Sequence, residues 1–280
     1  MPANNSKKPV DARDAARAQV VAMREAQAKR EQRTRNIMIV ALALVLVALI
    51  VVIVFVLHGR STNSSNNAGA TLGTEVPAGA NADGSFSLGK DGTVGSTNAG
   101  APVVTVYADY MCPGCGQFEE ANADTLDQER QAGTVTWVMH PVATLDQLSK
   151  GTQYSTRAAS AFALVADRAP SVLIAFNKAL FDNQPAENTA GLSDAQIADI
   201  ARQAAVPDDV AQQISDGTAM ARFGGWVQST TAAVVANKDL VMDGYTSFVT
   251  PTVTLNGEIF TGNWLDPAVL SQAIAAAKNG

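Results

Sequence analysis

The sequence has 280 residues, of which 47% are hydrophobic, and it carries a net charge of −6. This length suffices for one substantial domain with accessory segments, and the negative charge sets the chain apart from the basic proteins that bind nucleic acids. The charge is unevenly spread, because residues 1–36 hold nine basic and four acidic side chains, a net charge of +5, whereas the residues after Leu57 hold 11 basic and 22 acidic ones, a net charge of −11. This asymmetry indicates that the two parts lie in different compartments.

Residues 37–57 separate these two parts and read IMIVALALVLVALIVVIVFVL, without a charged or polar side chain. About 20 apolar residues match the hydrocarbon core of a bilayer, so we expect a single transmembrane helix. The positive-inside rule then makes residues 1–36 a cytoplasmic basic tail and places everything after Arg60 outside the cell membrane. A cleaved signal peptide is the competing interpretation, but its apolar core would span only about 7–15 residues, with a cleavage site close behind.

Residues 58–84 are rich in Ser, Asn, Gly and Ala and hold almost no large apolar side chain. Such a segment cannot bury a core, and we expect a flexible linker. The folded domain is then expected over residues 85–280. It opens at residues 84–89, where Phe86 and Leu88 alternate with small polar residues and predict a strand at the domain edge.

The central signal is a strand that leads into two cysteines. Residues 102–107 are nearly all Val and Thr, which predicts a strand with two buried faces that ends at Asp109. The motif Cys112-Pro113-Gly114-Cys115 follows, and it holds the only two cysteines of the sequence. Cysteines at this spacing can close a small disulfide ring, so the motif predicts a redox site.

The motif also opens a helix. Pro113 suits a first helical turn, because its missing N–H would have no intrahelical partner there. The partial positive charge at the helix N-terminus favours the thiolate of Cys112. We expect this helix to bury Cys115 and Phe118, and to turn Glu119 and Glu120 toward solvent.

Residues 135–139 predict the next strand, with Trp137 packed in the sheet and His140 partly buried at the strand end. A helical block follows at about residues 150–240, and Gly224-Gly225 is expected to be a weak point near its end. Its helices are predicted at residues 156–167, 171–181, 193–204, 207–215 and 220–235.

Residues 252–260 return to a strand pattern, and Asn256-Gly257 within them is a strong hairpin signal. A last helix is predicted at residues 266–278. The order is therefore strand, redox helix, strand, helical block, hairpin and helix, and the strand–helix–strand unit requires a right-handed crossover with parallel pairing. The predicted fold class is α/β, a thioredoxin-like sheet with an inserted helical domain, preceded by a single transmembrane helix.

Other interpretations of the cysteine pair stay open. An inert disulfide is one, although so short a loop would stabilise the fold little. A structural zinc site needs four ligands, and besides the cysteines the sequence offers only His58 and His140, so no metal or cofactor is expected. Trp226 and Trp264 are expected to line the core or a groove.

The motifs together resemble the DsbA-like branch of the thioredoxin superfamily. The resemblance covers roughly residues 86–280 and rests on YADYMCPGCGQF at residues 107–118, on Thr250-Pro251-Thr252 and on the helical block between them. It implies that Cys112 is the exposed nucleophile and that Cys115 is its buried resolving partner. It implies also that Pro251 is a cis-proline facing the disulfide, and that the Thr250 backbone pairs with a substrate chain beside Cys112.

Two further features bear on what the resemblance implies. Asp109 stands where many relatives hold an acid, which implies proton transfer at Cys115, although a capping role for Asp109 is equally open. Pro113 and Gly114 tune the reduction potential of the pair. They are neither the Pro-His of strongly oxidising relatives nor the Gly-Pro of reducing thioredoxins, and Thr250 is similar to the residue found in isomerase-type relatives.

We therefore expect an extracytoplasmic, membrane-anchored thiol–disulfide oxidoreductase that forms disulfides in exported thiol-containing proteins. A DsbB- or VKOR-like membrane protein would reoxidise the pair. A disulfide isomerase or reductase of the same fold is the first alternative. The second is a non-catalytic, tethered thioredoxin-like domain that only binds a partner. An exposed Cys112 sulfur with a groove at Pro251 would favour the oxidoreductase, whereas a buried Cys112 would favour the non-catalytic domain.

Overall fold

The structure is a computed structural model and describes residues 72–278. These residues belong to the second of two units into which the chain divides, Met1–Gly69 and Ala70–Gly280. The predicted cytoplasmic tail (residues 1–36) and transmembrane helix (residues 37–57) lie outside the described residues. Within residues 72–278, every helix is too short or too polar to span a bilayer.

A five-stranded mixed sheet carries the fold, with the strand order β1-β3-β2-β4-β5. Its strands are β1 (Phe86–Leu88), β2 (Val103–Ala108), β3 (Thr136–Pro141), β4 (Thr252–Leu255) and β5 (Glu258–Ile259). The strands β2 and β3 are parallel, with Val104 opposite Trp137, whereas β4 runs antiparallel to β2, with Val253 opposite Val106. The predicted strand–helix–strand unit and the closing hairpin are both confirmed.

The hairpin turn follows from its two central residues. Asn256 and Gly257 have φ angles of 55° and 88°, and two consecutive positive φ angles are what a type I′ turn requires. The Asn256 side chain also accepts a hydrogen bond from the Val103 N–H at 2.9 Å, which ties the turn to the start of β2.

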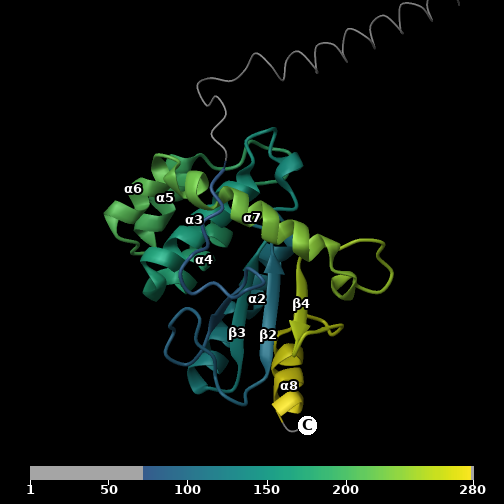
Figure 1. Ribbon diagram of the computed structural model, residues 1–280. Coiled ribbons are helices and arrows are strands. Elements are labelled where there is room, and N and C mark those ends of the chain that lie inside the picture. The colour runs from purple at the N-terminus through teal and green to yellow at the C-terminus, as the bar shows by residue number, and fades with distance from the viewer. Residues whose placement is uncertain (1–71, 279–280) are drawn as a thin grey trace, which may run out of the picture. The chain divides into compact units, whose positions relative to one another are not determined.

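The helices fall into two groups (Figure 1). Helices α2 (Pro113–Ala132) and α8 (Pro267–Lys278) lie beside the strands and pack against each other. The other group gathers at one end of the strands, where the sequence predicts a helical block. It comprises α3 (Tyr154–Arg168), α4 (Leu173–Asp182), α5 (Asp194–Gln203), α6 (Asp208–Ser215) and α7 (Thr218–Ala236), with short 3-10 turns η1 (Asp146–Leu148), η2 (Pro170–Val172) and η3 (Lys238–Leu240).

The start of α5 follows from the sequence. The Ser193 side chain accepts a hydrogen bond from the Gln196 N–H, and the Gln196 side chain accepts one from the Ser193 N–H. This is the capping box that the spacing of the two residues predicts.

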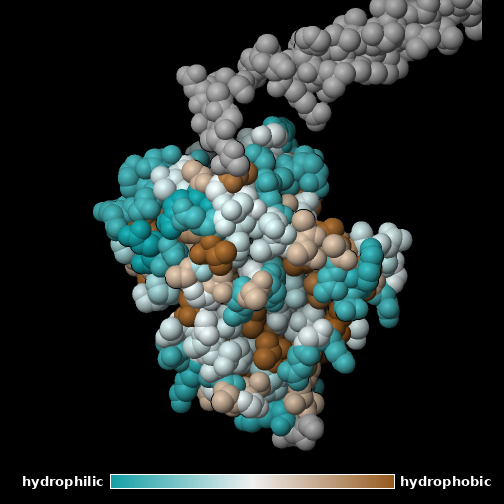
Figure 2. Space-filling view, viewed as in Figure 1, coloured by the Kyte–Doolittle hydropathy of each residue, from teal (hydrophilic) through white to brown (hydrophobic). Residues whose placement is uncertain are grey.

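Helix α3 is the centre of the helical group and joins it to the sheet. It packs closely along α7, because Ala158, Ala159 and Ala161 are fully buried and their small side chains allow close approach. The Phe162 ring contacts the Phe86 ring of β1 edge to face, with centroids 5.3 Å apart. On the face that Figure 2 shows, the hydrophobic surface is scattered in small patches among polar residues.

The linker prediction, residues 58–84, needs correction from residue 72 onward, because this part is bound to α7. The Gly73 N–H donates to the Ala221 carbonyl at 2.7 Å, and the Gly73 carbonyl accepts from the Gly225 N–H at 2.9 Å. The Glu75 N–H donates to the Arg222 carbonyl at 3.2 Å. We call residues 72–78 the strap. Its composition looked like that of a linker because main-chain hydrogen bonds, which composition does not reveal, contribute much of its attachment.

Helix α7 continues through Gly224-Gly225, where the sequence predicts a weak point, and that prediction of weakness stays untested. These glycines make room for the strap. A Cβ atom on Gly225 would lie 2.8 Å from the Leu72 carbonyl oxygen, and one on Gly73 would lie 2.4 Å from the Ala221 carbonyl oxygen. Both positions therefore require glycine for the close approach of two backbones.

Candidate redox site

The redox motif stands at the junction of β2 and α2. Cys112 is the N-cap residue of α2, and Pro113 occupies the first helical turn as predicted. The Cys112 carbonyl accepts hydrogen bonds from the N–H groups of Cys115 at 2.9 Å and Gly116 at 3.2 Å. The motif thus lies at the positive end of the α2 dipole, where an anion is favoured.

Both cysteines are free thiols, and both are largely covered: Cys112 is 7% exposed and Cys115 is 1% exposed. The expectation of a clearly exposed Cys112 is therefore wrong, although it is the more accessible of the two. The cover comes from the Thr250-Pro251 segment. Cys112 Sγ donates a hydrogen bond to the Thr250 carbonyl at 3.2 Å, and a Cβ on Gly114 would lie 3.1 Å from Pro251 Cδ.

The surroundings of the two sulfurs give them opposite acidities. Hydrogen bonding from the Cys115 side chain, supported by the Thr250 side chain and by the N–H groups of Cys115 and Gly114, lowers the pKa of Cys112 to about 6 despite its burial. Burial, together with the hydrogen bond that Cys115 gives to Cys112, raises the pKa of Cys115 well above its ordinary value. Near neutral pH the pair therefore carries its negative charge on Cys112.

The Thr250–Pro251 peptide bond is cis, as the resemblance implied. Pro251 directly precedes β4, and the pairing of β4 with β2 brings it to the end of the sheet that carries the motif. Among the described residues, the Thr250 N–H has no hydrogen-bond acceptor. It is therefore available to a peptide that lies along this edge.

Asp109 is fully buried, and its carboxylate holds the turn before the motif. Its oxygens accept hydrogen bonds from the Met111 N–H at 2.9 Å, the Ser155 hydroxyl at 2.7 Å and the Leu145 N–H at 2.9 Å. The capping prediction for Asp109 is wrong, because no side chain caps α2. These contacts tie the motif to the start of α3, while proton transfer at Cys115 stays a prediction.

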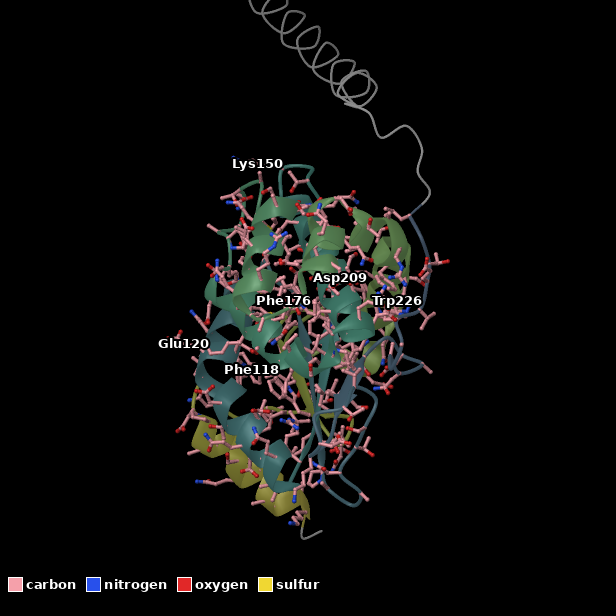
Figure 3. All side chains as sticks on the ribbon, turned by 90° about the vertical axis from the view of Figure 1, so that its left-hand side faces the viewer. Phe118, Glu120, Lys150, Phe176, Asp209 and Trp226 are labelled. Carbon is pink, nitrogen blue, oxygen red and sulfur yellow. The ribbon has the colours of Figure 1, made fainter. Side chains whose placement is uncertain are left out.

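Glu119 corrects another expectation, since it is only 6% exposed. Its carboxylate accepts a hydrogen bond from the Asn177 amide at 2.7 Å, and Asn177 in turn accepts one from the Tyr110 hydroxyl at 2.9 Å. Burial raises the pKa of Glu119 to about 7. Glu120 behaves as predicted and lies at the outer edge of the molecule (Figure 3).

A signal for this buried glutamate was present in the sequence. Cys115, Phe118, Glu119 and Asn122 lie at positions i, i+3, i+4 and i+7, and all four are buried along one face of α2. Figure 3 shows Phe118 within the molecule, in contrast to Glu120. The spacing predicts burial of Glu119 whatever its charge, whereas the partner Asn177 comes from α4 and could not be predicted locally.

The histidine and tryptophan residues considered in the sequence analysis contribute to packing. His140 is 1% exposed, within hydrogen-bonding distance of the Asp83 carbonyl (3.1 Å) and stacked on the Tyr107 ring. Trp137 is buried in the sheet as predicted. Trp226 packs against Phe86, and Trp264 packs against Phe118, which fits the core or groove-lining prediction. No three His, Cys, Asp or Glu side chains of residues 72–278 are grouped to hold a metal ion.

Comparison with known proteins agrees with this geometry. The profile of a family described as Thioredoxin matches residues 87–276, and the chain belongs to this family. The structure is similar to that of oxidised DsbA from Mycobacterium tuberculosis, with 30% identity, a TM-score of 0.55, and coverage of 70% of this chain and 93% of that one. It is also similar to reduced DsbG, a disulfide bond oxidoreductase from the same organism, with 29% identity, a TM-score of 0.55, and coverage of 69% and 87%. The matched region is thus an oxidoreductase domain.

A curated relative is similar over the same domain but is much longer. The serine/threonine-protein kinase PknE of Mycobacterium tuberculosis is 26% identical over 188 residues, which span 66% of this chain and 31% of the kinase. This chain thus corresponds to about a third of the length of the curated relatives that it matches, and the similarity concerns that part alone.

Proposed function

We propose that this chain is a membrane-anchored, extracytoplasmic thiol–disulfide oxidoreductase that forms disulfides in exported proteins. The observation that carries the proposal is the contrast between the two cysteines, in which the pKa of Cys112 is lowered to about 6 and that of Cys115 is raised well above its ordinary value. A low-pKa thiolate leaves readily and stabilises the reduced form of the pair, which makes the disulfide form oxidising.

The exchange begins when a substrate thiolate attacks Cys112 Sγ in the Cys112–Cys115 disulfide. The S–S bond breaks, and its electron pair leaves with Cys115, which takes up a proton because its pKa is high. A second substrate thiolate then attacks the substrate sulfur of the mixed disulfide and expels Cys112 as a thiolate. Two electrons pass from the substrate to the protein, whose cysteines end as the free thiols of this structure.

Substrate placement would use the segment next to Pro251. The Thr250 carbonyl lies 3.2 Å from Cys112 Sγ, and the Thr250 N–H has no acceptor among the described residues. A substrate chain that pairs with this backbone would hold its cysteine next to Cys112. Such backbone pairing does not depend on the side chains of the substrate, so it suits an enzyme with many protein substrates.

The extracytoplasmic location rests on the sequence. The nine basic residues before residues 37–57 support a cytoplasmic N-terminus, and the apolar stretch supports an anchor. Each turnover leaves the pair reduced, so the proposal includes an oxidant in the same membrane. A DsbB- or VKOR-like protein that passes electrons to a quinone would supply this chemistry.

The test is a trapping experiment with the full-length chain in its own cells. In Cys115→Ala, the Cys112 thiolate attacks a disulfide of an exported protein, the substrate S–S bond breaks, and one substrate sulfur leaves as a thiolate. Cys115 is not there to resolve this mixed disulfide, so reductant-sensitive adducts with exported proteins should accumulate in the membrane fraction. Cys112→Ala is the matched control and should form none. Equal adducts in both variants, or no adducts, would support the non-catalytic alternative. Adducts made mainly with cytoplasmic proteins would contradict the location.

A further inference from the structure

A side chain from the helical group touches the redox motif directly. Gln184 follows the end of α4 and is half-buried. Its amide nitrogen donates hydrogen bonds to two backbone carbonyls, that of Tyr110 at 3.1 Å and that of Cys112 at 2.9 Å. Gln184 thus bridges the residues that flank Met111, directly before the motif.

The orientation of this amide follows from its partners. A primary amide offers two N–H donors on one nitrogen, and both partners here are carbonyl oxygens that can only accept. The opposite orientation would place the amide oxygen against two other oxygens. The Gln184 amide therefore donates both of its N–H groups, one to the Tyr110 carbonyl and one to the Cys112 carbonyl, and we call this pair of hydrogen bonds the clamp.

Gly116 provides the space for the clamp. A Cβ atom at this position would lie 2.7 Å from Gln184 Oε1, closer than a normal contact. Gly116 lies in the first turns of α2, where its φ angle is not positive, so its backbone conformation does not demand glycine. A side chain at residue 116 would therefore require the end of the Gln184 side chain to move.

We propose that Gln184 is a positioning residue of the redox site: its amide fixes the carbonyls of Tyr110 and Cys112 and so ties the helical group to the turn that carries the nucleophile. Among the described residues, the Tyr110 carbonyl has no other hydrogen-bond donor. The Cys112 carbonyl, in contrast, is shared between the clamp and the N–H groups of Cys115 and Gly116. Removing the clamp would free the turn while leaving α2 its own first hydrogen bonds.

The consequence for the reaction concerns the thiolate. The N–H groups of Gly114 and Cys115 stabilise the Cys112 thiolate only while the first turn of α2 points them at the sulfur. A turn without the clamp samples other orientations, and the Cys112 thiolate loses part of this stabilisation. Gln184 never touches the sulfur, so it acts through the backbone.

The experiment compares two glutamines of one groove between α2 and α4, which both Gln117 and Gln184 line. Gln184→Met keeps the size of the side chain and removes both donors. It should raise the Cys112 pKa by about half a unit, the size expected for partial loss of a helix-terminus effect. Gln117→Met is the matched control, because Gln117 is exposed and has no hydrogen bond to the motif. It should leave that pKa unchanged. The readout is the ultraviolet absorbance of the thiolate during a pH titration of the full-length chain.

Gly116→Ala tests the same contact from the other side. The added methyl group would displace the Gln184 amide, so the Cys112 pKa should rise as in Gln184→Met. Alanine favours a helix over glycine, so α2 itself is not weakened by this change. In the Gly116→Ala/Gln184→Met double variant, the Cys112 pKa should rise no more than in the more strongly affected single variant. Both changes remove the same contact, so their effects should not add.

Three results would overturn the proposal: an unchanged pKa in a folded Gln184→Met variant, an equal shift in Gln117→Met, or additive shifts in the double variant. If Gln184→Met fails to fold, Gly116→Ala alone decides. The inference concerns the site of the proposed function, but thiolate absorbance does not depend on the direction of electron flow. A chain that proves to be a reductant would refute the oxidase proposal and leave this one standing.

Discussion

Buried carboxylates give the redox helix a dependence on pH that its cysteines alone would not produce. Asp109 and Glu119 are both buried, and burial raises the pKa of Asp109 to about 6 and that of Glu119 to about 7. Asp109 accepts hydrogen bonds from two backbone N–H groups, while Glu119 accepts one from a side-chain amide. These hydrogen bonds favour the ionised forms, but burial outweighs them at both residues.

The sign of the Glu119 effect on stability follows from linkage. A carboxyl group whose folded pKa exceeds its unfolded value stabilises the fold while protonated, and this contribution is lost as the pH rises through the folded pKa. For Glu119 the loss falls between its ordinary pKa of 4.5 and its folded pKa of about 7.

Glu119→Gln should therefore gain stability relative to the parent chain as the pH rises through this window. The advantage should grow by about 1.4 kcal/mol per pH unit at most and level off above the folded pKa. Chemical denaturation of both proteins across the pH range measures it. Glu120→Gln, at the exposed neighbouring position, is the control and should show no such trend. A constant difference between Glu119→Gln and the parent would show that folding does not raise the pKa of Glu119.

At the scale of elements, the strap forms backbone hydrogen bonds with groups in the middle of α7. Gly73 both donates to Ala221 and accepts from Gly225, so its backbone lies between two groups of α7 that are four residues apart. The Arg222 side chain adds ion pairs to Glu75 at 2.8 Å and to Asp167 of α3 at 3.3 Å. The strap therefore joins two helices of the helical group, and a fragment that begins at residue 84 would lack these contacts.

Gly73→Ala should detach the strap, because the new methyl group would meet two backbone carbonyls that cannot move aside. Four backbone hydrogen bonds between the strap and α7 would be lost. Because some of the freed α7 groups could then form intrahelical hydrogen bonds, we expect a loss of about 1–2 kcal/mol of unfolding free energy. Hydrogen exchange at the Gly73 and Glu75 amides should accelerate. Thr74→Ala, at an exposed position of the strap, should change neither quantity. Retained protection at Gly73 in the Gly73→Ala variant would contradict this account.

Sequence patterns predict features that depend on neighbouring residues, but not contacts between residues that are far apart in the sequence. The β2 strand, the start of α2 at Pro113, the capping box at Ser193 and the Asn256-Gly257 turn are set by neighbours within a few residues, so each could be predicted. The strap, the Asn177 partner of Glu119 and the Gln184 clamp join residues far apart in sequence. In the sequence, each of these contacts is marked only by a glycine or a polar side chain, and the partner that explains it lies on another helix or strand.

For the whole molecule, the redox pair could be predicted because the Cys112–Cys115 motif is local and chemically distinctive, whereas the cis-proline at Pro251 was implied by the family resemblance. Their juxtaposition follows from the antiparallel pairing of β4 with β2. The coverage of Cys112 could not be predicted, because it depends on how closely Thr250 and Pro251 approach the first turn of α2. Contacts of this kind set the thiolate's stability and hence the reduction potential, which is why the motif alone does not fix the direction of electron flow.

The reduction potential of the Cys112–Cys115 pair tests the account most directly. It is measured on the full-length chain by equilibration in glutathione buffers, with Cys112→Ser as the redox-inactive control. The lowered pKa of Cys112 and the raised pKa of Cys115 predict a value well above that of thioredoxin, about −270 mV, and toward that of DsbA, about −120 mV. A value near or below that of thioredoxin would contradict the oxidase and indicate a reductase or isomerase.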